Sequence, residues 1–203
     1  MAGNPCWGVF ENYRIALTAE FDTRTFATFW SSFWLSSYGN TLKWIVLMVS
    51  GTVGLGLVFA VLADRVKYEA LAKAIIFMPM AVSFVGAGII WKFVYDYGTQ
   101  QVQIGLLNSI ITKLGGQPVA FLSTLHVNTF ALVVVGVWIW TGFCMTIISA
   151  ALKSVPDEVL EAARVDGATE WTVFWKIMVP IIMPTITVVV TTMVINVLKL
   201  FDI

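Results

Sequence analysis

Four long apolar stretches divide the chain, and each is long enough to cross a lipid bilayer as a helix. The hydrocarbon core is about 30 Å thick and a helix rises about 1.5 Å per residue, so one crossing needs roughly 20 apolar residues. A segment in lipid must satisfy its own backbone hydrogen bonds, which favours helices. The four stretches contain a single charged residue, Lys199, near the end of the last one. The predicted transmembrane helices are residues 44–63, 74–91, 127–152 and 177–200.

Positive charge is concentrated in two of the connections between these helices. Residues 64–73 carry three basic side chains, and residues 153–176 carry three basic and five acidic ones, whereas residues 92–126 carry only two basic ones. Short cytoplasmic loops are enriched in Lys and Arg. We therefore expect 64–73 and 153–176 on the cytoplasmic side and 1–43 and 92–126 outside.

The first segment, residues 1–43, is predicted to be extracytoplasmic and interfacial. An aromatic stripe with helical spacing suggests a helix that lies in the membrane interface, packed against the spans or the lipid headgroups. The stripe comprises Phe26, Phe29, Trp30, Phe33 and Trp34.

The composition agrees with an integral membrane protein of the all-α class. Hydrophobic residues make up 59% of the chain and charged residues 12%, and the mean hydropathy is +0.86. The formal net charge is zero, which argues against nucleic-acid binding. Cys6, Cys144 and His126 form no metal-ligand motif, so neither a metal nor a cofactor is expected.

Small residues and prolines within the spans predict where helices approach one another and where they bend. Small side chains allow close packing in lipid, and a proline removes a backbone donor. The predicted seams are Gly142, Thr146 and Ala150, then Ser50 and Gly54, then Pro79, Ser83 and Ala87; the predicted kink sites are Pro79, Pro180 and Pro184.

The loop at 153–176 contains the most informative motif in the chain. Ser154, Pro156 and two acidic residues are typical of a helix start, and Gly167 is suited to close that helix in the left-handed conformation. Glu161 and Arg164 are spaced for an ion pair. The sequence therefore predicts a short helix within 154–168, followed by a second amphipathic run over 169–178.

At these residues the chain resembles the inner-membrane permease subunits of binding-protein-dependent ABC importers. Glu161-Ala162-Ala163, Gly167, Ile177 and Pro180 match the spacing of the EAA signature of that family, with Val179 in place of the usual leucine. The resemblance implies that this helix is the coupling helix, which docks on a cytoplasmic ATPase subunit. The residues it assigns to ATPase coupling are Glu161, Ala162, Ala163, Asp166 and Gly167.

Further segments are similar to carbohydrate importers of the maltose and α-glucoside type. They are residues 7–14, 39–42, 77–79, 90–93 and 105–108, and residues 198–203 are similar to the α-glucoside branch in particular. The resemblance implies that the single domain, 1–203, contains core helices two to five of a six-helix permease core and lacks the first and the last.

Span 177–200 carries the only polar line among the predicted helices. Thr185, Thr192, Asn196 and Lys199 project within about 60° of one another at about 100° per residue, and Asp202 extends the line about 60° beyond Lys199. Two interpretations stay open: a line facing a translocation path, or a marker of the outer interface. Trp138 is a further candidate for the path through sugar stacking, with packing as its alternative role.

The apolar spans predict a multi-pass membrane protein, and the resemblance implies a subunit of a sugar importer in a bacterial inner membrane. The resemblance implies four kinds of partner: a second permease subunit, cytoplasmic ATP-binding subunits, an extracytoplasmic solute-binding protein and membrane lipid. No GxxxxGK[ST] loop is present, so the chain is not expected to be an enzyme. The alternatives are a permease for an amino acid or phosphate and, with less support, a membrane-embedded enzyme.

Overall fold

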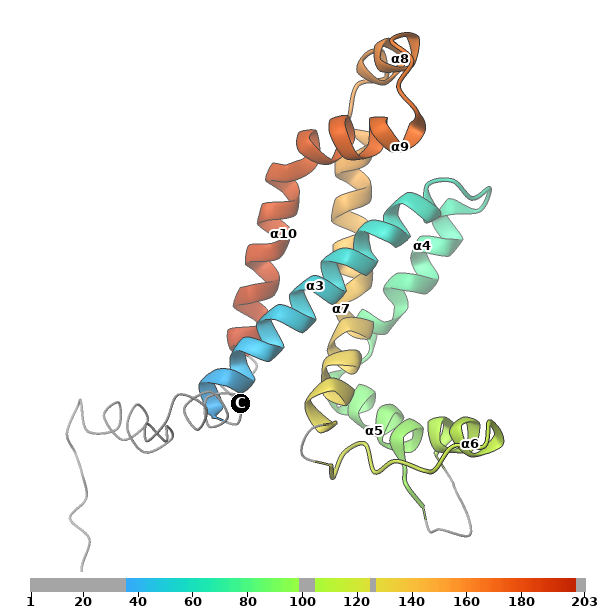
Figure 1. Cartoon of the computed structure of the whole chain (residues 1–203), viewed down its shortest axis with the longest axis vertical. Helices are drawn as coiled ribbons and strands as arrows, with labels where there is room; N and C mark the ends of the chain where they lie inside the picture. Colours follow the sequence, from blue (N-terminus) through green and yellow to red (C-terminus); the bar gives the residue numbers. More distant parts are fainter. Residues whose placement is uncertain (1–35, 99–104, 125–126, 200–203) are drawn as a thin grey trace, which may run out of the picture. The chain divides into compact units, whose positions relative to one another are not determined.

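The computed structural model describes residues 36–98, 105–124 and 127–199, and every regular element in these ranges is a helix. This confirms the all-α prediction. The elements are α3 (Ser37–Ala63), α4 (Glu69–Phe77), the 3-10 helix η1 (Met78–Ala81), α5 (Phe84–Tyr95), α6 (Leu106–Lys113), α7 (Asn128–Lys153), α8 (Asp157–Val165), α9 (Glu170–Val173), the π-helix η2 (Phe174–Met178) and α10 (Val179–Lys199) (Figure 1).

The chain divides into two compact units, residues 1–44 and residues 45–203. In the first unit only residues 36–44, with the first turns of α3, are described. The aromatic stripe predicted over 26–34 lies outside the described residues.

Three continuous helical segments are long and apolar enough to cross a membrane: Tyr38–Ala63, Asn128–Lys153 and Glu170–Lys199. They overlap the first, third and fourth predicted spans. The last continues through η2, where the hydrogen-bonding register changes from α to π just before Pro180 and Pro184. Each proline lacks a backbone N–H, which explains a local change of register here.

The second predicted span, 74–91, is not one straight helix. The segments Glu69–Ala81 and Phe84–Tyr95 together are apolar enough to span, but they are bent by 98° at the break between them. Pro79 occupies the start of η1, and Ser83 caps α5 by accepting a hydrogen bond from the Gly86 N–H at 3.1 Å. The kink predicted at Pro79 is confirmed, whereas the seam predicted along Pro79, Ser83 and Ala87 assumed a continuous helix and is wrong.

Within the second unit, α3, α7 and α10 share one apolar core. Buried side chains from all three helices contribute to it: Val49, Ala60 and Ala63 from α3, Cys144, Met145, Ile148 and Leu152 from α7, and Ile182, Val189 and Met193 from α10. Val155 extends this core beyond the end of α7 and is 5% exposed. The segment that leads into α8 is therefore anchored by apolar burial.

Close helix contacts occur at glycines, but only partly at those predicted. A Cβ built on Gly142 would lie 2.6 Å from both the Ile76 carbonyl oxygen and the Phe77 Cα, so α4 packs directly on this glycine of α7. The other predicted positions in that seam, Thr146 and Ala150, are exposed. Gly54 has nothing within 4 Å of its Cβ position.

On α3 the close approaches fall instead on Gly51 and Gly56. Cβ atoms there would meet Val137 and Cys144 of α7, each at 2.8 Å. The prediction of Ser50 and Gly54 chose the wrong face of α3, because hydropathy does not show which face of an apolar helix meets a neighbour.

The connection between α5 and α7 is organised around Asn108, which is fully buried. Its Nδ2 donates to the carbonyls of Asp96 (2.9 Å) and Val119 (3.1 Å), and its Oδ1 accepts from the Val119 N–H (2.8 Å). A Cβ on Gly105 would lie 2.1 Å from the Asp96 oxygen. Close packing thus explains the glycine at position 105, and backbone hydrogen bonds explain the asparagine at position 108.

Candidate functional site

Helix α8 projects from the end of the bundle where α7 finishes (Figure 1). Asp157 and Glu158 occupy its first turn and Arg164 its last, an arrangement that complements the helix dipole. Pro156 precedes the helix in an extended conformation. Ser154, predicted to cap α8, instead ends α7 and donates its hydroxyl to the Ala151 carbonyl.

The end of α8 is closed by Gly167, as predicted. Gly167 has φ +83°, a conformation that a residue with a Cβ adopts only with strain. Its N–H bonds to the Arg164 carbonyl, and the Ala168 N–H bonds to the Ala163 carbonyl, both at 3.0 Å. This pair of bonds is the Schellman arrangement, which satisfies the last carbonyls of the helix and turns the chain back.

Four of the five predicted coupling residues are exposed on this short helix and its turn. They are Glu161, Ala162, Asp166 and Gly167, whereas Ala163 is 9% exposed and faces the protein. The exposed surface combines carboxylates with a small apolar side chain, so a partner can approach the backbone closely without displacing bulky groups.

The link between α8 and α9 is electrostatic. Arg164 Nε bonds to Glu170 Oε1 at 2.8 Å, so the partner of Arg164 is Glu170 and not Glu161 as predicted. The hydrogen bond that Arg164 donates to the Glu170 carboxylate raises the pKa of the Arg164 guanidinium. Thr169 begins α9 by accepting a hydrogen bond from the Thr172 N–H at 3.3 Å. The glycine turn is therefore bridged by an ion pair as well as by backbone bonds.

The residues of the predicted polar line lie on α10 as far as the structure describes the chain, and their role in a path stays a prediction. Thr192 donates its hydroxyl to the Val188 carbonyl at 2.8 Å, and Asn196 donates its Nδ2 to the Thr192 carbonyl at 3.0 Å. Thr185 and Asn196 are half-buried, and Lys199 is exposed at the end of the helix. Asp202 lies outside the described residues.

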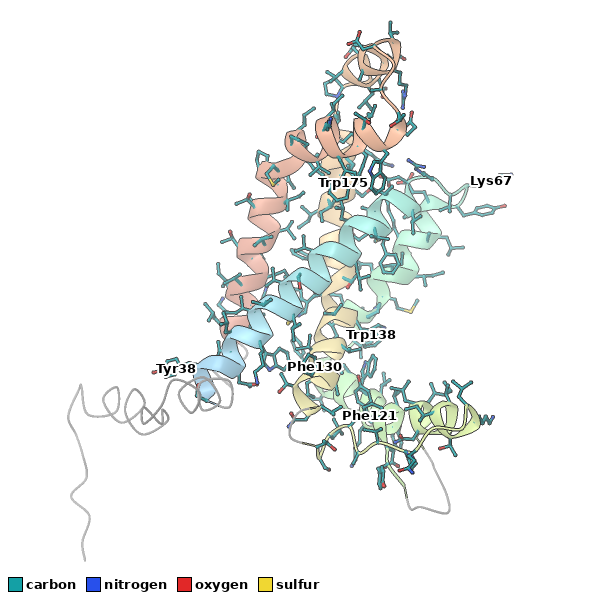
Figure 2. All side chains as sticks on the ribbon, viewed as in Figure 1. Tyr38, Lys67, Phe121, Phe130, Trp138 and Trp175 are labelled. Atoms are coloured by element: carbon teal, nitrogen blue, oxygen red, sulfur yellow. The ribbon has the colours of Figure 1, made fainter. Side chains whose placement is uncertain are left out.

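Trp138, on α7, is placed among apolar side chains rather than with that polar line. Its ring packs edge-on against Trp91 with centroids 5.7 Å apart. Both tryptophans line a groove of about 390 Å³ among α3, α4, α5 and α7 together with Phe59, Pro79 and Thr141, and no α10 residue lines it. Figure 2 shows Trp138 near the junction of α7 and α5. The predicted path residues are thus not brought together in this groove.

An ionic cluster at the α8 end of the bundle was not predicted. Lys73 Nζ lies 2.6 Å from Asp64 Oδ1 and 2.5 Å from Glu69 Oε1, and it also bonds to the Ser149 hydroxyl. Lys153 bonds to the same Glu69 carboxylate. The i,i+4 spacing of Glu69 and Lys73 was a readable signal, but the contribution of α7 depends on tertiary packing.

The described residues contain no group of three or more His, Cys, Asp or Glu side chains placed to hold a metal ion. The candidate site is the exposed face of α8 and its turn, which presents Glu161, Ala162, Asp166 and Gly167. Apolar helices of this length, a broken span and an exposed helix closed by glycine define a multi-pass helical membrane protein.

The chain belongs to the family described as the binding-protein-dependent transport system inner membrane component, which matches residues 26–203. It is 56% identical over 83% of its length to the osmoprotective compounds uptake permease protein of Synechocystis sp.. It is 51% identical over 81% to the alpha-glucoside transport system permease protein of Rhizobium meliloti. The matches cover 61% and 49% of those two relatives, so the chain spans about half to three fifths of their length.

Solved structures show the same fold. The crystal structure of a bacterial ABC transporter involved in the import of alginate has a chain that is 24% identical, with a TM-score of 0.69, over 79% of this chain and 56% of that one. The same type of transporter with an alginate pentasaccharide-bound periplasmic protein gives a TM-score of 0.70 at 22% identity, over 94% and 67%. The family assignment made from the EAA-type spacing is confirmed by the family match.

Proposed function

We propose that this protein is a permease subunit that forms part of the path by which an ABC importer moves an α-glucoside-type sugar across the bacterial inner membrane. The observation that carries the proposal is α8, an exposed helix whose end is fixed by Gly167 at positive φ and which belongs to a chain of this transport family. A partner that pushes on α8 pushes on the ends of α7 and α9, to which it is joined.

ATP hydrolysis is assigned to cytoplasmic partner subunits, because the chain carries no phosphate-binding loop of the GxxxxGK[ST] kind. In this proposal Glu161, Ala162, Asp166 and Gly167 form the surface that docks on the ATP-binding subunit. A second permease subunit completes the path, and an extracytoplasmic protein delivers the solute. Loops 64–73 and 153–176 then lie in the cytoplasm.

The sugar class is supported by the relatives. They include an alpha-glucoside transport system permease protein at 51% identity and a trehalose/maltose transport system permease protein of Thermococcus litoralis at 34% identity. A second candidate is the uptake of osmoprotective compounds, which is favoured by the Synechocystis relative at 56% identity. The amino acid, phosphate and membrane-enzyme alternatives find no support among these relatives.

A transport assay with the complete transporter separates the candidates. Cells that lack the gene and cells that carry it are compared for uptake of labelled maltose, trehalose, osmoprotective compounds, an amino acid and phosphate. We expect gene-dependent, ATP-dependent uptake of an α-glucoside. Uptake of only the osmolytes selects the second candidate, and uptake of only the amino acid or phosphate refutes the proposal of a sugar permease.

A further inference from the structure

The ionic cluster joins three separate parts of the second unit. Asp64 lies in the connection after α3, Glu69 and Lys73 lie on α4, and Ser149 and Lys153 lie near the end of α7. Ser149 is 1% exposed and donates its hydroxyl to Asp64 Oδ1 at 2.7 Å. Two lysines and two carboxylates balance in charge, so the cluster is neutral as a whole.

The ionic cluster is expected to stay closed, because the charges of Lys73 and Asp64 are poorly exposed to water. The side chains of Lys73 and Asp64 are only 21% and 18% exposed, so separating them leaves two poorly solvated charges. Removing one partner from such a pair costs more than the pair contributes to stability. The cluster therefore resists opening even where its net contribution to folding is small.

The same two helices are tied together a second time, further along. Glu69, Lys73 and Ile76 recur at helical spacing on one face of α4, and Lys153, Ser149 and Gly142 recur on one face of α7. Ionic and hydroxyl contacts hold the beginning of α4, and backbone packing on Gly142 holds its end. α4 and the C-terminal half of α7 thus form an antiparallel pair fixed at both ends.

The two helices lead to α8 and to the bend in the broken span. α7 ends at Lys153, four residues before α8 begins at Asp157, and α4 runs directly into η1 and the 98° bend. In Figure 1, α4 lies beside α7 from the α8 end of the bundle down to the bend.

We propose that Lys73 is a positioning residue that makes α4 and the end of α7 one rigid strut, through which a displacement of α8 reaches the bend at residues 78–83. This inference rests on the proposed function, because it assumes that α8 is moved by an ATP-hydrolysing partner. The movement of α8 then has a second consequence, because the broken span shifts together with α7.

The test uses the complete transporter in proteoliposomes and measures maltose uptake per ATP hydrolysed. Lys73→Met removes the charge while keeping a long side chain, and Lys73→Arg keeps the charge. Lys67→Met is the matched control, because Lys67 lies in the connection just before α4 and is exposed. We expect Lys73→Met to lower uptake per ATP at least about five-fold, the lower end of typical coupling between sites. Lys73→Arg and Lys67→Met should stay near wild type.

A cross-linking experiment then distinguishes a rigid contact between α4 and α7 from a contact that must open during transport. In a background without Cys6 and Cys144, Lys73→Cys with Ser149→Cys should give poor coupling when reduced. A short reversible bifunctional thiol reagent should restore coupling, and Lys73→Cys alone should gain nothing from the reagent. Lys153→Met is a milder variant, since that side chain is 52% exposed, and it should show a smaller loss in the same direction.

Two results overturn the inference: normal coupling in Lys73→Met and Lys153→Met, or inactivation of the double-cysteine transporter by the cross-link. The latter means that α4 and α7 have to separate during the cycle. Cross-linking yield with and without ATP gives a readout without solute, and equal yields are expected. If the wild-type transporter takes up no solute, the proposed function fails. If the wild type takes up solute and Lys73→Met has the same uptake per ATP hydrolysed, only the strut is rejected.

Discussion

Gly142→Ala is expected to destabilise the protein because a single methyl group there collides with backbone. The new Cβ would lie 2.6 Å from the Ile76 oxygen and from the Phe77 Cα, and backbone atoms have no alternative rotamer. Ordinary contacts between carbon atoms are about 3.5–4.0 Å, so α4 must move away by about 1 Å. Overpacking costs up to about 3 kcal/mol, and replacing a helical glycine recovers about 1 kcal/mol, which leaves a loss of about 2 kcal/mol.

Gly54→Ala is the matched control, because its Cβ meets nothing within 4 Å and only the gain in helix propensity remains. The assay is thermal unfolding of the detergent-purified protein in a Cys6→Ser background. A fluorogenic thiol dye then reports exposure of Cys144, which is fully buried in the folded chain. Gly142→Ala should melt below the parent and Gly54→Ala at or above it. Identical melting of the two variants would refute the close α4–α7 packing.

Three further outcomes follow from the described contacts. Gly167→Val should uncouple ATP hydrolysis from uptake while membrane insertion stays intact. Gly167→Asn should retain most coupling, because Asn tolerates positive φ. Equal uptake per ATP in the two variants would contradict a role of the positive-φ turn in coupling. Asn196→Leu should impair uptake while assembly and basal ATPase activity persist. Thiol reagents should label Cys at 196 and 199 more readily than Cys at the buried position 197, and labelling only at 199 would mean that the polar line marks the membrane boundary. Asn108→Ala should lower stability by about 1–3 kcal/mol, because it leaves partly buried backbone groups of Asp96 and Val119 unpaired. An unchanged melting temperature contradicts that role.

The sequence carried enough information for the helices and for the glycine-closed turn after α8. Apolar length alone located the spans, because a bilayer imposes both a minimum length and internal hydrogen bonding. The closure of α8 was readable because positive φ selects glycine, and Gly167 has φ +83°. The kink at Pro79 followed from its missing donor, although the 98° size of the bend did not, since it depends on the Ser83 cap and on packing.

The contacts between helices could not be read in the same way. An apolar helix offers several faces with small residues, so Ser50 and Gly54 looked as suitable as Gly51 and Gly56, which make the contacts. Arg164 was assigned to Glu161 by helical spacing, but the turn at Gly167 brings Glu170 closer. Both errors concern side chains from segments that only the fold places together.

The docking of α8 on an ATP-binding subunit is the central claim, and photocross-linking tests it directly. A photoreactive amino acid is placed at Val159, an exposed position on α8, and as a control at Val188, an exposed position on α10. In membranes that contain the assembled transporter, irradiation should join position 159 to an ATP-binding subunit and should give no such product from position 188. Products from 159 that contain only lipid or permease, with the ATP-binding subunits present, would contradict the assignment of α8 as the coupling helix.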